Sequence, residues 1–465
     1  MTLKRYIGDK AFYKAVLTIA VPMMIQTGIN NFVSLLDNLM IGRLGTNSLS
    51  GVAIANQIIF VYYLLIFGAT AGVGIFTAQY QGIGNVDGVR DTFRMKVMTN
   101  LVLAALAITF LYFYTAPLIG LFLKGEGSAS DASETLQIGS QYMRIMLIGL
   151  VPLCLTNAYS GTLRDTGQTR IPMLAAMTSV FVNLIGNLLL IYGLCGFPAL
   201  GARGAAIATV IARFVELSFL VIYTGTHSAQ HPFIIGAFRH LTIPRRLALK
   251  FFVRALPLII NETLWSLGQT TMNQCYSYRS LSAMAALNIE STLWMFLSVT
   301  FLALGEAAGI VTGQTLGSGN FDKARDEAYK LRAFTIACGI LGGIFMLVVS
   351  PYFPLLYNTT EDVRHLASGL IFAYGLLMPF YAYTHVSYFI LRSGGNSLIT
   401  FLFDGCFVWL VSVPGAFIVS HFTAVPVITM IIIVQSLELV KCIIGGCMVT
   451  SGIWIRNIVA DSQGG

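Results

Sequence analysis

The stretch AVLTIAVPMMIQTGINNFVSLLDNLMIGRLG, residues 15–45, is long and apolar enough to cross a bilayer, yet it is not purely apolar. At about 100° per residue, one side of such a helix carries a stripe of polar side chains: Gln26, Asn30, Ser34 and Asp37. An ionisable group inside a span is costly, so we expect Asp37 to face a bundle interior or a wet cavity rather than lipid. The alternative is that Asp37 lies at the end of the helix, in the headgroup region.

The composition extends this interpretation to the whole chain. Hydrophobic residues make up 56% of the 465 residues, and charged residues make up 10%. Soluble domains carry about 25% charged residues, so we predict an all-α integral membrane protein. Twelve apolar runs are long enough to span, at approximately 15–40, 50–78, 95–119, 136–160, 171–194, 204–224, 250–274, 284–312, 333–353, 366–391, 398–420 and 426–450.

The basic residues predict the orientation of the chain. If the N-terminus is cytoplasmic, most of the 28 Lys and Arg residues fall in inner loops and termini, among them Lys4, Arg5, Lys96 and Arg332. The outer connections hold Arg43, Lys124, Arg203, Arg279 and Arg364. This bias predicts a multi-pass protein of the cytoplasmic (inner) membrane with both termini cytoplasmic. The net charge of +8 therefore reflects topology, and we expect no nucleic-acid partner.

The two halves of the chain resemble each other. Three pairs of segments match: Ala20-Val21-Pro22 with Ala255-Leu256-Pro257, GVGIFTAQYQGIGNVDGVR (72–90) with GIVTGQTLGSGNFDKAR (309–325), and LRDTGQT (163–169) with LRSGGNS (391–397). Such matches indicate a duplicated six-helix unit. Because six is even, both units enter the membrane in the same direction. We therefore expect two pseudo-symmetric six-helix lobes around a central cavity, at 1–224 and 250–465, joined by a cytoplasmic linker at 225–249.

The predicted span near residues 250–274 repeats the pattern of the first. One face carries polar side chains, with Asn261 beside them: Glu262, Ser266, Gln269 and Asn273. Pro22 and Pro257 each precede their stripe by about one turn. Proline frees a backbone carbonyl and permits a bend, so we predict that both act as hinges. The alternative is that they only shape static packing.

Further polar residues lie inside other predicted spans. Asn183 and Asn187 are four residues apart and share one face, from which they can bond Asp37 or coordinate an ion; the alternative is a role in holding helices together. Glu438 and Lys441 are three residues apart, and self-paired charges are poor candidates for function. The sequence assigns no role to Asp404, Glu290 or Glu438.

Several function classes find no support in the sequence. The Gly-rich stretches at 72–84 and 305–319 follow no strand and lack GK[ST], so we expect close helix contacts and a tight turn there instead of a nucleotide site. HExxH, GxSxG and His/Cys metal clusters are absent from the sequence. We therefore predict no enzyme activity, no cofactor and no structural metal.

These segments together resemble the multidrug and toxic compound extrusion (MATE) transporters along nearly the whole chain. The elements that carry the resemblance are Pro22 followed by LLDNLMIGRLG, the two Gly/Gln stretches, LRDTGQTRIP (163–172) and GARGAAIATVIAR (201–213). The resemblance implies twelve helices in two lobes. It also implies export of bulky, often cationic, organic compounds by antiport against H⁺ or Na⁺, without ATP.

The resemblance carries over to individual positions. Asp37 falls on the family's acidic position in helix 1, and Asn183 matches the helix-5 asparagine of the same ion site. Where the H⁺-linked prokaryotic pattern has an aspartate, this chain has Asn187. Glu262 lies about one turn nearer the proline than the acidic residue of the Na⁺-linked branch, whose helix-10 aspartate has no counterpart here. H⁺ and Na⁺, the latter at Asp37 and Asn183, both stay open as the coupling ion.

The working hypothesis is a monomeric efflux transporter for drugs and dyes in the lipid bilayer, operating by alternating access. Asp37 would be a carboxylate seen alternately by ion and drug. Gln26, Asn30, Asn183 and Asn187 would complete its site; Glu262, Gln269 and Asn273 would serve the second lobe. The alternative is a flippase of the same superfamily for a lipid-linked precursor, whose anionic cargo needs cavity cations. The natural substrate, the stoichiometry and the conformational state are not predicted.

Overall fold

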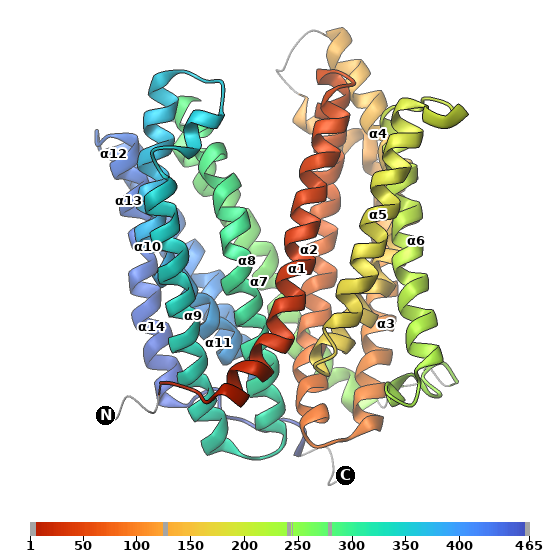
Figure 1. Ribbon diagram of the computed structural model, residues 1–465, viewed down its shortest axis with the longest axis vertical. Helices are drawn as coiled ribbons and strands as arrows, with labels where there is room; N and C mark the ends of the chain where they lie inside the picture. Colours follow the sequence, from red (N-terminus) through yellow and green to blue (C-terminus); the bar gives the residue numbers. More distant parts are fainter. Residues whose placement is uncertain (1–5, 124–128, 240–242, 244, 278–280, 461–465) are drawn as a thin grey trace. The chain divides into compact units, whose positions relative to one another are not determined.

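The computed structural model describes residues 6–123, 129–239, 243, 245–277 and 281–460. Lys4, Arg5, Lys124 and Arg279 lie outside these residues. Regular secondary structure in the described part is helical, which confirms the predicted fold class (Figure 1). The long helices before the middle of the chain are α1 (Lys10–Gly42), α2 (Thr46–Gly82), α3 (Val86–Phe122), α4 (Ala129–Asp165), α5 (Arg170–Tyr192) and α6 (Ala202–Thr226), with short turns η2 (Leu194–Gly196) and η3 (Pro232–Ile234).

The second half follows the same plan. Its helices are α7 (Arg245–Ser277), α8 (Leu281–Gly317), α9 (Phe321–Val349), η4 (Phe353–Leu356), α10 (Glu361–Ser393), α11 (Ser397–Phe401), η5 (Leu402–Cys406), η6 (Val408–Ser412), α12 (Val413–Phe422), α13 (Val427–Ser436) and α14 (Glu438–Ser451). The segments from α11 to α12 form one continuous helical span, Ser397–Phe422, and α13 with α14 form another, Val427–Ser451. η5 and η6 are π-helical, with turns wider than those of an α-helix.

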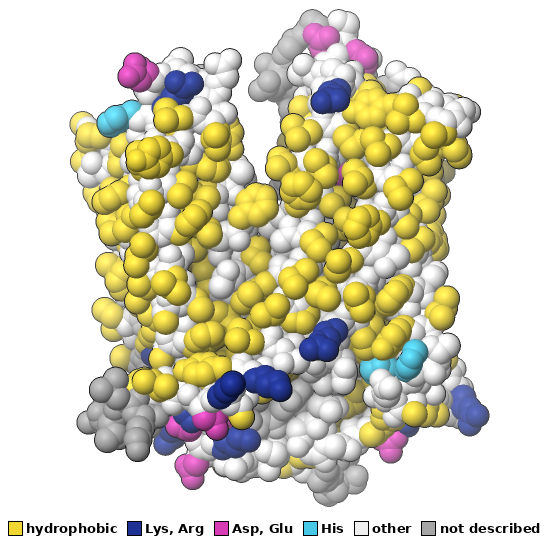
Figure 2. All heavy atoms as spheres, viewed as in Figure 1, with side chains coloured by type: hydrophobic (Ala, Val, Ile, Leu, Met, Phe, Trp, Pro, Cys, Tyr) yellow, Lys and Arg dark blue, Asp and Glu magenta, His cyan; other side chains and the backbone are white. Residues whose placement is uncertain are grey.

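Eleven helical segments of the described chain are long and apolar enough to cross a membrane. The twelfth predicted span corresponds to α7, which is 33 residues long but more polar because it carries the Glu262 stripe. On the face shown in Figure 2, hydrophobic side chains cover the middle of the helices, while Lys, Arg, Asp and Glu gather towards the helix ends. This banding is what a bilayer requires of a multi-pass helical protein.

The chain divides into two compact units. Unit 1 contains Met1–Met24, Ala78–Asn85 and Val253–Gly465, and unit 2 contains Ile25–Thr77 and Val86–Phe252. The division falls inside α1, two residues beyond Pro22. The first turns of α1 belong to the buried core of unit 1, where Ala20 packs in one cluster with Leu304 and Ala307 of α8. The lobe boundaries at 1–224 and 250–465 stay a prediction.

Small residues bring helices together within each unit. In unit 1, a Cβ on Gly343 of α9 would lie 2.5 Å from the backbone oxygen of Gly375 in α10. In unit 2, a Cβ on Gly204 of α6 would lie 2.3 Å from the backbone oxygen of Leu190 in α5. Such close backbone approaches are how membrane helices gain van der Waals contact without help from a hydrophobic effect.

The repeated Gly-rich stretches contact each other inside unit 1. A Cβ on Gly82 would lie 1.9 Å from the backbone oxygen of Gln314, and one on Gly317 would lie 2.1 Å from that of Gln79. Gly84 and Gly319, two residues further on, have φ of 69° and 79°. These angles favour glycine because a Cβ strains the left-handed region. The predicted close helix contact and tight turns are therefore confirmed.

Replacing Gly317 with Ala is expected to destabilise the protein by about 1–3 kcal/mol, the usual cost of forcing a methyl group into a packed backbone contact. The matched control is Gly120→Ala, also within a helix, because a Cβ at Gly120 meets no atom within 4 Å. Unfolding in detergent micelles measures both. Equal stability of the two variants would mean that the reciprocal glycine contact is not formed in the folded protein.

Candidate binding sites in the two units

Asp37 of α1 is half-buried and is held by amides of α5 in unit 2. The Asn187 amide donates a hydrogen bond to Asp37 Oδ1 at 2.6 Å, and also bonds Asn183 Oδ1 at 3.2 Å. The Asn183 amide in turn donates to Thr209 Oγ1 of α6 at 3.1 Å. A hydrogen bond between Asp37 and α5, one of the roles that the sequence leaves open for these asparagines, is thus present. Among the described residues Asp37 takes part in no ion pair, so its charge is not already neutralised by the protein.

The two asparagines are more deeply buried than the carboxylate. Asn183 is 6% exposed and Asn187 is 1% exposed. The Asn187 Oδ1 atom is buried and accepts no hydrogen bond within the described residues. A buried acceptor without a donor costs free energy, and a protonated carboxyl or a cation would satisfy it. The cluster therefore offers oxygen atoms, from Asp37 and Asn187, that can bind a small cation or a proton.

Gln26 and Asn30 do not join the Asp37 cluster. Along α1 they lie about 16 Å and 10 Å from Asp37, at 1.5 Å per residue. Gln26 is buried and accepts a hydrogen bond from Arg164 Nη2 of α4 at 2.8 Å. Asn30 is exposed. The polar stripe of α1 therefore contacts two different helices, α4 through Gln26 and α5 through Asp37. The distances along α1 exclude direct coordination of one ion by Gln26, Asn30 and Asp37 together. A role for either residue in binding stays a prediction.

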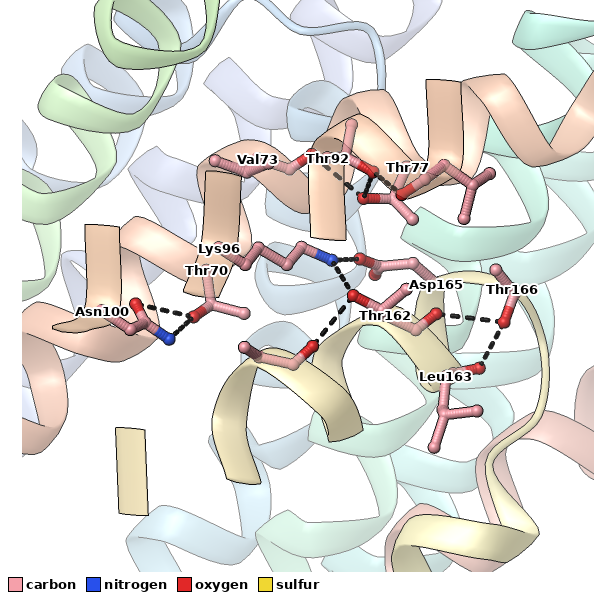
Figure 3. Close-up of polar contacts among 12 residues, drawn as sticks. Thr70, Val73, Thr77, Thr92, Lys96, Asn100, Thr162, Leu163, Asp165 and Thr166 are labelled. Atoms are coloured by element: carbon pink, nitrogen blue, oxygen red, sulfur yellow. Dashed lines mark hydrogen bonds and ion pairs between the residues drawn. The ribbon is translucent and has the colours of Figure 1, made fainter. Parts of the chain in front are cut away.

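A second polar cluster of unit 2 surrounds Lys96 of α3 (Figure 3). Lys96 is fully buried, and its Nζ lies 2.7 Å from Asp165 Oδ2 and 3.3 Å from Thr162 Oγ1, both in α4. Asp165 belongs to the LRDTGQT segment, and a Cβ on Gly74 would lie 2.6 Å from its Oδ2. The sequence placed Lys96 among the loop cations, but its charge is satisfied inside the helix bundle. This cluster joins α3 to α4.

Unit 1 contains a buried charge cluster, of which spacing along one helix predicts only the pair of Glu438 and Lys441. Lys441 Nζ of α14 lies 2.6 Å from Asp404 Oδ1 and 3.7 Å from Glu438 Oε1. Glu438 also accepts from Thr384 Oγ1 of α10 at 2.8 Å. Asp404 sits in the π-helical turn η5, a conformation often found where a helix is adapted to function. For the contact with Asp404, the only signal in the sequence is an opposite charge in another apolar span.

Asn261 and Glu262 of α7 connect this cluster to α10. The Asn261 side chain is fully buried; its amide donates to Asp404 Oδ2 at 3.0 Å, and its Oδ1 accepts from the Gly405 backbone N–H at 2.8 Å. Glu262 Oε1 accepts from the Tyr388 hydroxyl at 3.1 Å and takes part in no ion pair among the described residues. Glu262 thus resembles Asp37 in being a span carboxylate held by neutral donors.

The remaining predicted residues of α7 lie outside that network. Gln269 is half-buried and Asn273 is exposed. Pro22 and Pro257 lie within unbroken helices, α1 and α7. Four residues beyond each proline a buried amide takes a partner from its own unit, Gln26 from Arg164 and Asn261 from Asp404. The two halves are therefore also alike in having a buried, hydrogen-bonded amide four residues after the proline. The hinge role of the prolines stays a prediction.

Comparison with known proteins places these features in a family. The model of the MatE family matches residues 22–189 and 257–418, which is more than half of the chain and includes both carboxylates. The chain is 24% identical over 416 residues to the probable multidrug resistance protein YoeA of Bacillus subtilis, covering 88% of this chain and 87% of the relative. It is 23% identical over 420 residues to the probable multidrug resistance protein NorM of Thermotoga maritima, covering 88% and 86%.

The fold agrees with the sequence comparison. A solved structure of a multidrug resistance MATE family transporter of the MOP superfamily, in an outward-facing conformation, is similar with a TM-score of 0.83 at 19% identity, covering 96% of this chain and 98% of that one. The family match extends over both repeats and over the spans that hold Asp37 and Glu262. The chain therefore belongs to the MatE family of multidrug and toxic compound extrusion transporters.

Proposed function

We propose that this chain is a secondary active exporter of bulky, often cationic, organic compounds, driven by antiport against H⁺ or Na⁺. The observation that carries the proposal is Asp37, a carboxylate inside an apolar span that is held by the Asn187 amide and by no cation of the described chain. Intramembrane carboxylates of this kind are expensive and mark ion or substrate pathways. The multidrug resistance names of its relatives support the same conclusion.

The driving force comes from the inward movement of the coupling ion. One charge moving down a membrane potential of 100 mV supplies about 2.3 kcal/mol. In the proposal the ion neutralises Asp37, the helices around it repack, and cationic cargo loses its counter-charge and leaves on the outer side. The unpartnered Asn187 Oδ1 supports the presence of a proton or Na⁺ at this position, because either one satisfies it.

The other candidate residues take supporting roles in this proposal. Glu262, held by Tyr388, would serve the second lobe as Asp37 serves the first, with Gln269 and Asn273 facing cargo. Pro22 and Pro257 would be the hinges of alternating access. The hinge role of Pro22 is supported by the division of α1, which belongs to unit 1 up to Met24 and to unit 2 from Ile25. The protein would act as a monomer without a cofactor, with both termini cytoplasmic.

A flippase for a lipid-linked anion is the alternative within the superfamily. An anionic cargo requires arginine or lysine side chains free to bind it. At Asp37 and Glu262 the described hydrogen-bond partners are a neutral amide and a phenol, and Lys441 is already paired with Asp404. Arg332 of α9 forms no ion pair among the described residues, but it lines a separate groove with Tyr383 and lies at neither carboxylate. The exporter is therefore the better supported function.

Expression in a bacterium that lacks its own pumps tests the proposal. Cells with the chain are expected to accumulate several-fold less ethidium than cells with an empty vector. A protonophore at low Na⁺ should remove the difference, because both gradients are then collapsed. Repeating the assay across Na⁺ concentrations at fixed pH identifies the coupling ion. Efflux that survives the loss of both gradients would contradict secondary transport, and accumulation equal to the vector would contradict export.

A further inference from the structure

A groove on unit 1 lies outside the two sites described above. It has a volume of about 480 Å³ and is formed by α9, α10 and α14. Arg332 lies at one side of it, facing Tyr383, and the rest of its lining is mainly apolar. Among the described residues that line the groove, Arg332 is the only charged one. Its most prominent rim residues are Phe380, which is 41% exposed, and Ile443, which is 69% exposed.

Arg332 is buried without a counter-charge. The residue is 8% exposed, and its Nη2 donates a hydrogen bond to the Tyr383 hydroxyl. Its guanidinium carbon lies 4.5 Å from the centre of the Tyr383 ring. The Nε and Nη1 atoms have no hydrogen-bond partner, and Arg332 forms no ion pair within the described residues. A guanidinium cannot lose its proton, so a buried one needs an anion.

The position of Arg332 along α9 matches the membrane surface. The helix begins with the charged stretch DKARDEAYKLR (322–332) and continues with the apolar stretch AFTIACGILGGIFMLVV (333–349). Arg332 is therefore the last charged residue before the hydrocarbon region. On α14, Thr450 at the groove is one residue from the end of the helix at Ser451. The guanidinium thus lies at the level of lipid headgroups, and the apolar part of the groove lies at the level of acyl chains.

Glycine lets α14 pack closely against the Arg332–Tyr383 pair. A Cβ on Gly446 of α14 would lie 2.6 Å from the Tyr383 hydroxyl and 3.7 Å from Arg332 Nη2. Any larger residue would push against the pair that positions the charge. The combination of two unsatisfied N–H donors and an apolar groove fits a ligand with an anionic head and a hydrocarbon tail.

We propose that this groove binds an anionic phospholipid, with its phosphate on Arg332 and an acyl chain along Phe380 and Ile443. Charge-assisted hydrogen bonds from arginine to phosphate are strong, and Nε and Nη1 of Arg332 each have an N–H donor without a partner among the described residues. The positive charge disfavours the cationic compounds proposed as cargo. A zwitterionic lipid binds more weakly because its ammonium group meets no carboxylate among the residues lining the groove. The site is thus distinct from the transport sites and joins three helices of unit 1 through a lipid.

Native mass spectrometry of the full chain, titrated in detergent with phosphatidylglycerol, tests the proposal. The wild type is expected to bind one phosphatidylglycerol at least about tenfold more tightly than phosphatidylcholine, and Arg332→Met is expected to weaken that binding by about tenfold, the effect of one lost charge-assisted contact. The matched control is Lys330→Met on the same helix, since Lys330 is already paired with Asp326. Its binding should equal that of the wild type.

Two further arms keep the result decisive. Thr450→Trp places an indole at the exposed rim of the groove and leaves Arg332 unchanged. This variant is expected to reduce phosphatidylglycerol binding, and it tests the proposal even if Arg332→Met fails to fold. Inorganic phosphate at millimolar concentration should not displace the lipid. Equal retention of phosphatidylglycerol by wild type and Arg332→Met would overturn the proposal. Displacement by inorganic phosphate, or equal binding of phosphatidylcholine, would also overturn it, because the groove would then not recognise an anionic lipid.

Discussion

Replacing Asp37 with Asn is expected to raise ethidium accumulation to that of cells carrying an empty vector. The substitution keeps the shape of the side chain, and the new amide oxygen can still accept the hydrogen bond from Asn187. What it removes is the charge that the coupling ion and the cationic cargo are proposed to share. An amide cannot exchange a proton at working pH and holds a cation far less strongly than a carboxylate.

The control for this prediction is another aspartate of unit 2. Asp91 of α3 is paired with Arg94 at 2.9 Å and is partly exposed, so Asp91→Asn should change stability by about 0–1 kcal/mol and leave efflux within about twofold of the wild type. Membrane abundance and unfolding in detergent must be equal for both variants. Normal efflux by Asp37→Asn would remove Asp37 from the mechanism, whereas the resemblance in fold would be unaffected.

The membrane helices and the duplication could be predicted from the sequence because bilayer thickness sets one length for every span. Hydropathy alone therefore located them, including α7, whose polar stripe makes it the least apolar. The matching glycines of the two halves, Gly82 and Gly317, predicted a close contact that the structure contains. In each case a local pattern was sufficient for the prediction, since the length of an apolar run and the position of a glycine can be read from one segment of the sequence alone.

Contacts between helices could be predicted only in part. Helical spacing placed Asn183 and Asn187 on one face, and the bond to Asp37, 150 residues away, followed from the expectation that span carboxylates find polar partners. The pairing of Lys441 with Asp404, 37 residues apart, did not follow. Spacing shows which residues share a face of one helix, but it contains no information on which other helix that face meets.

Two cations are buried although their positions along the chain predict exposure in inner loops. Lys96 and Arg332 counted as inner-loop residues in the topology argument, yet both are buried within helices. The positive-inside rule uses only the position of a charge along the chain, and long side chains near a helix end can turn either way. The boundary between the two units at Met24 of α1 has one local signal, Pro22, which does not show which helices each part of α1 contacts.

Replacing Lys441 with Met is expected to destabilise the protein by about 3–5 kcal/mol, because it leaves Asp404 and Glu438 as uncompensated charges in the core of unit 1. The double variant Lys441→Met with Asp404→Asn should recover the part of this loss that is due to Asp404, since the new amide still accepts the hydrogen bond from Asn261 and carries no charge, while Glu438 stays uncompensated. The free energy of unfolding in detergent micelles is measured for both and for Asp404→Asn alone, which completes the cycle and isolates the coupling.

The contrast with an exposed pair decides whether the cluster is buried in the folded protein. Lys330 and Asp326 form an ion pair on α9 with side chains 21% and 44% exposed, so Lys330→Met should cost less than about 1 kcal/mol. The side chains of Lys441 and Asp404 are 9% and 14% exposed, and their ions have lost most of their water. If Lys441→Met costs no more than Lys330→Met, then Asp404 is either solvated or protonated in the folded state. In that case the π-helical turn around Asp404 would be a site open to ions, and efflux by Asp404→Asn would become the decisive measurement for unit 1.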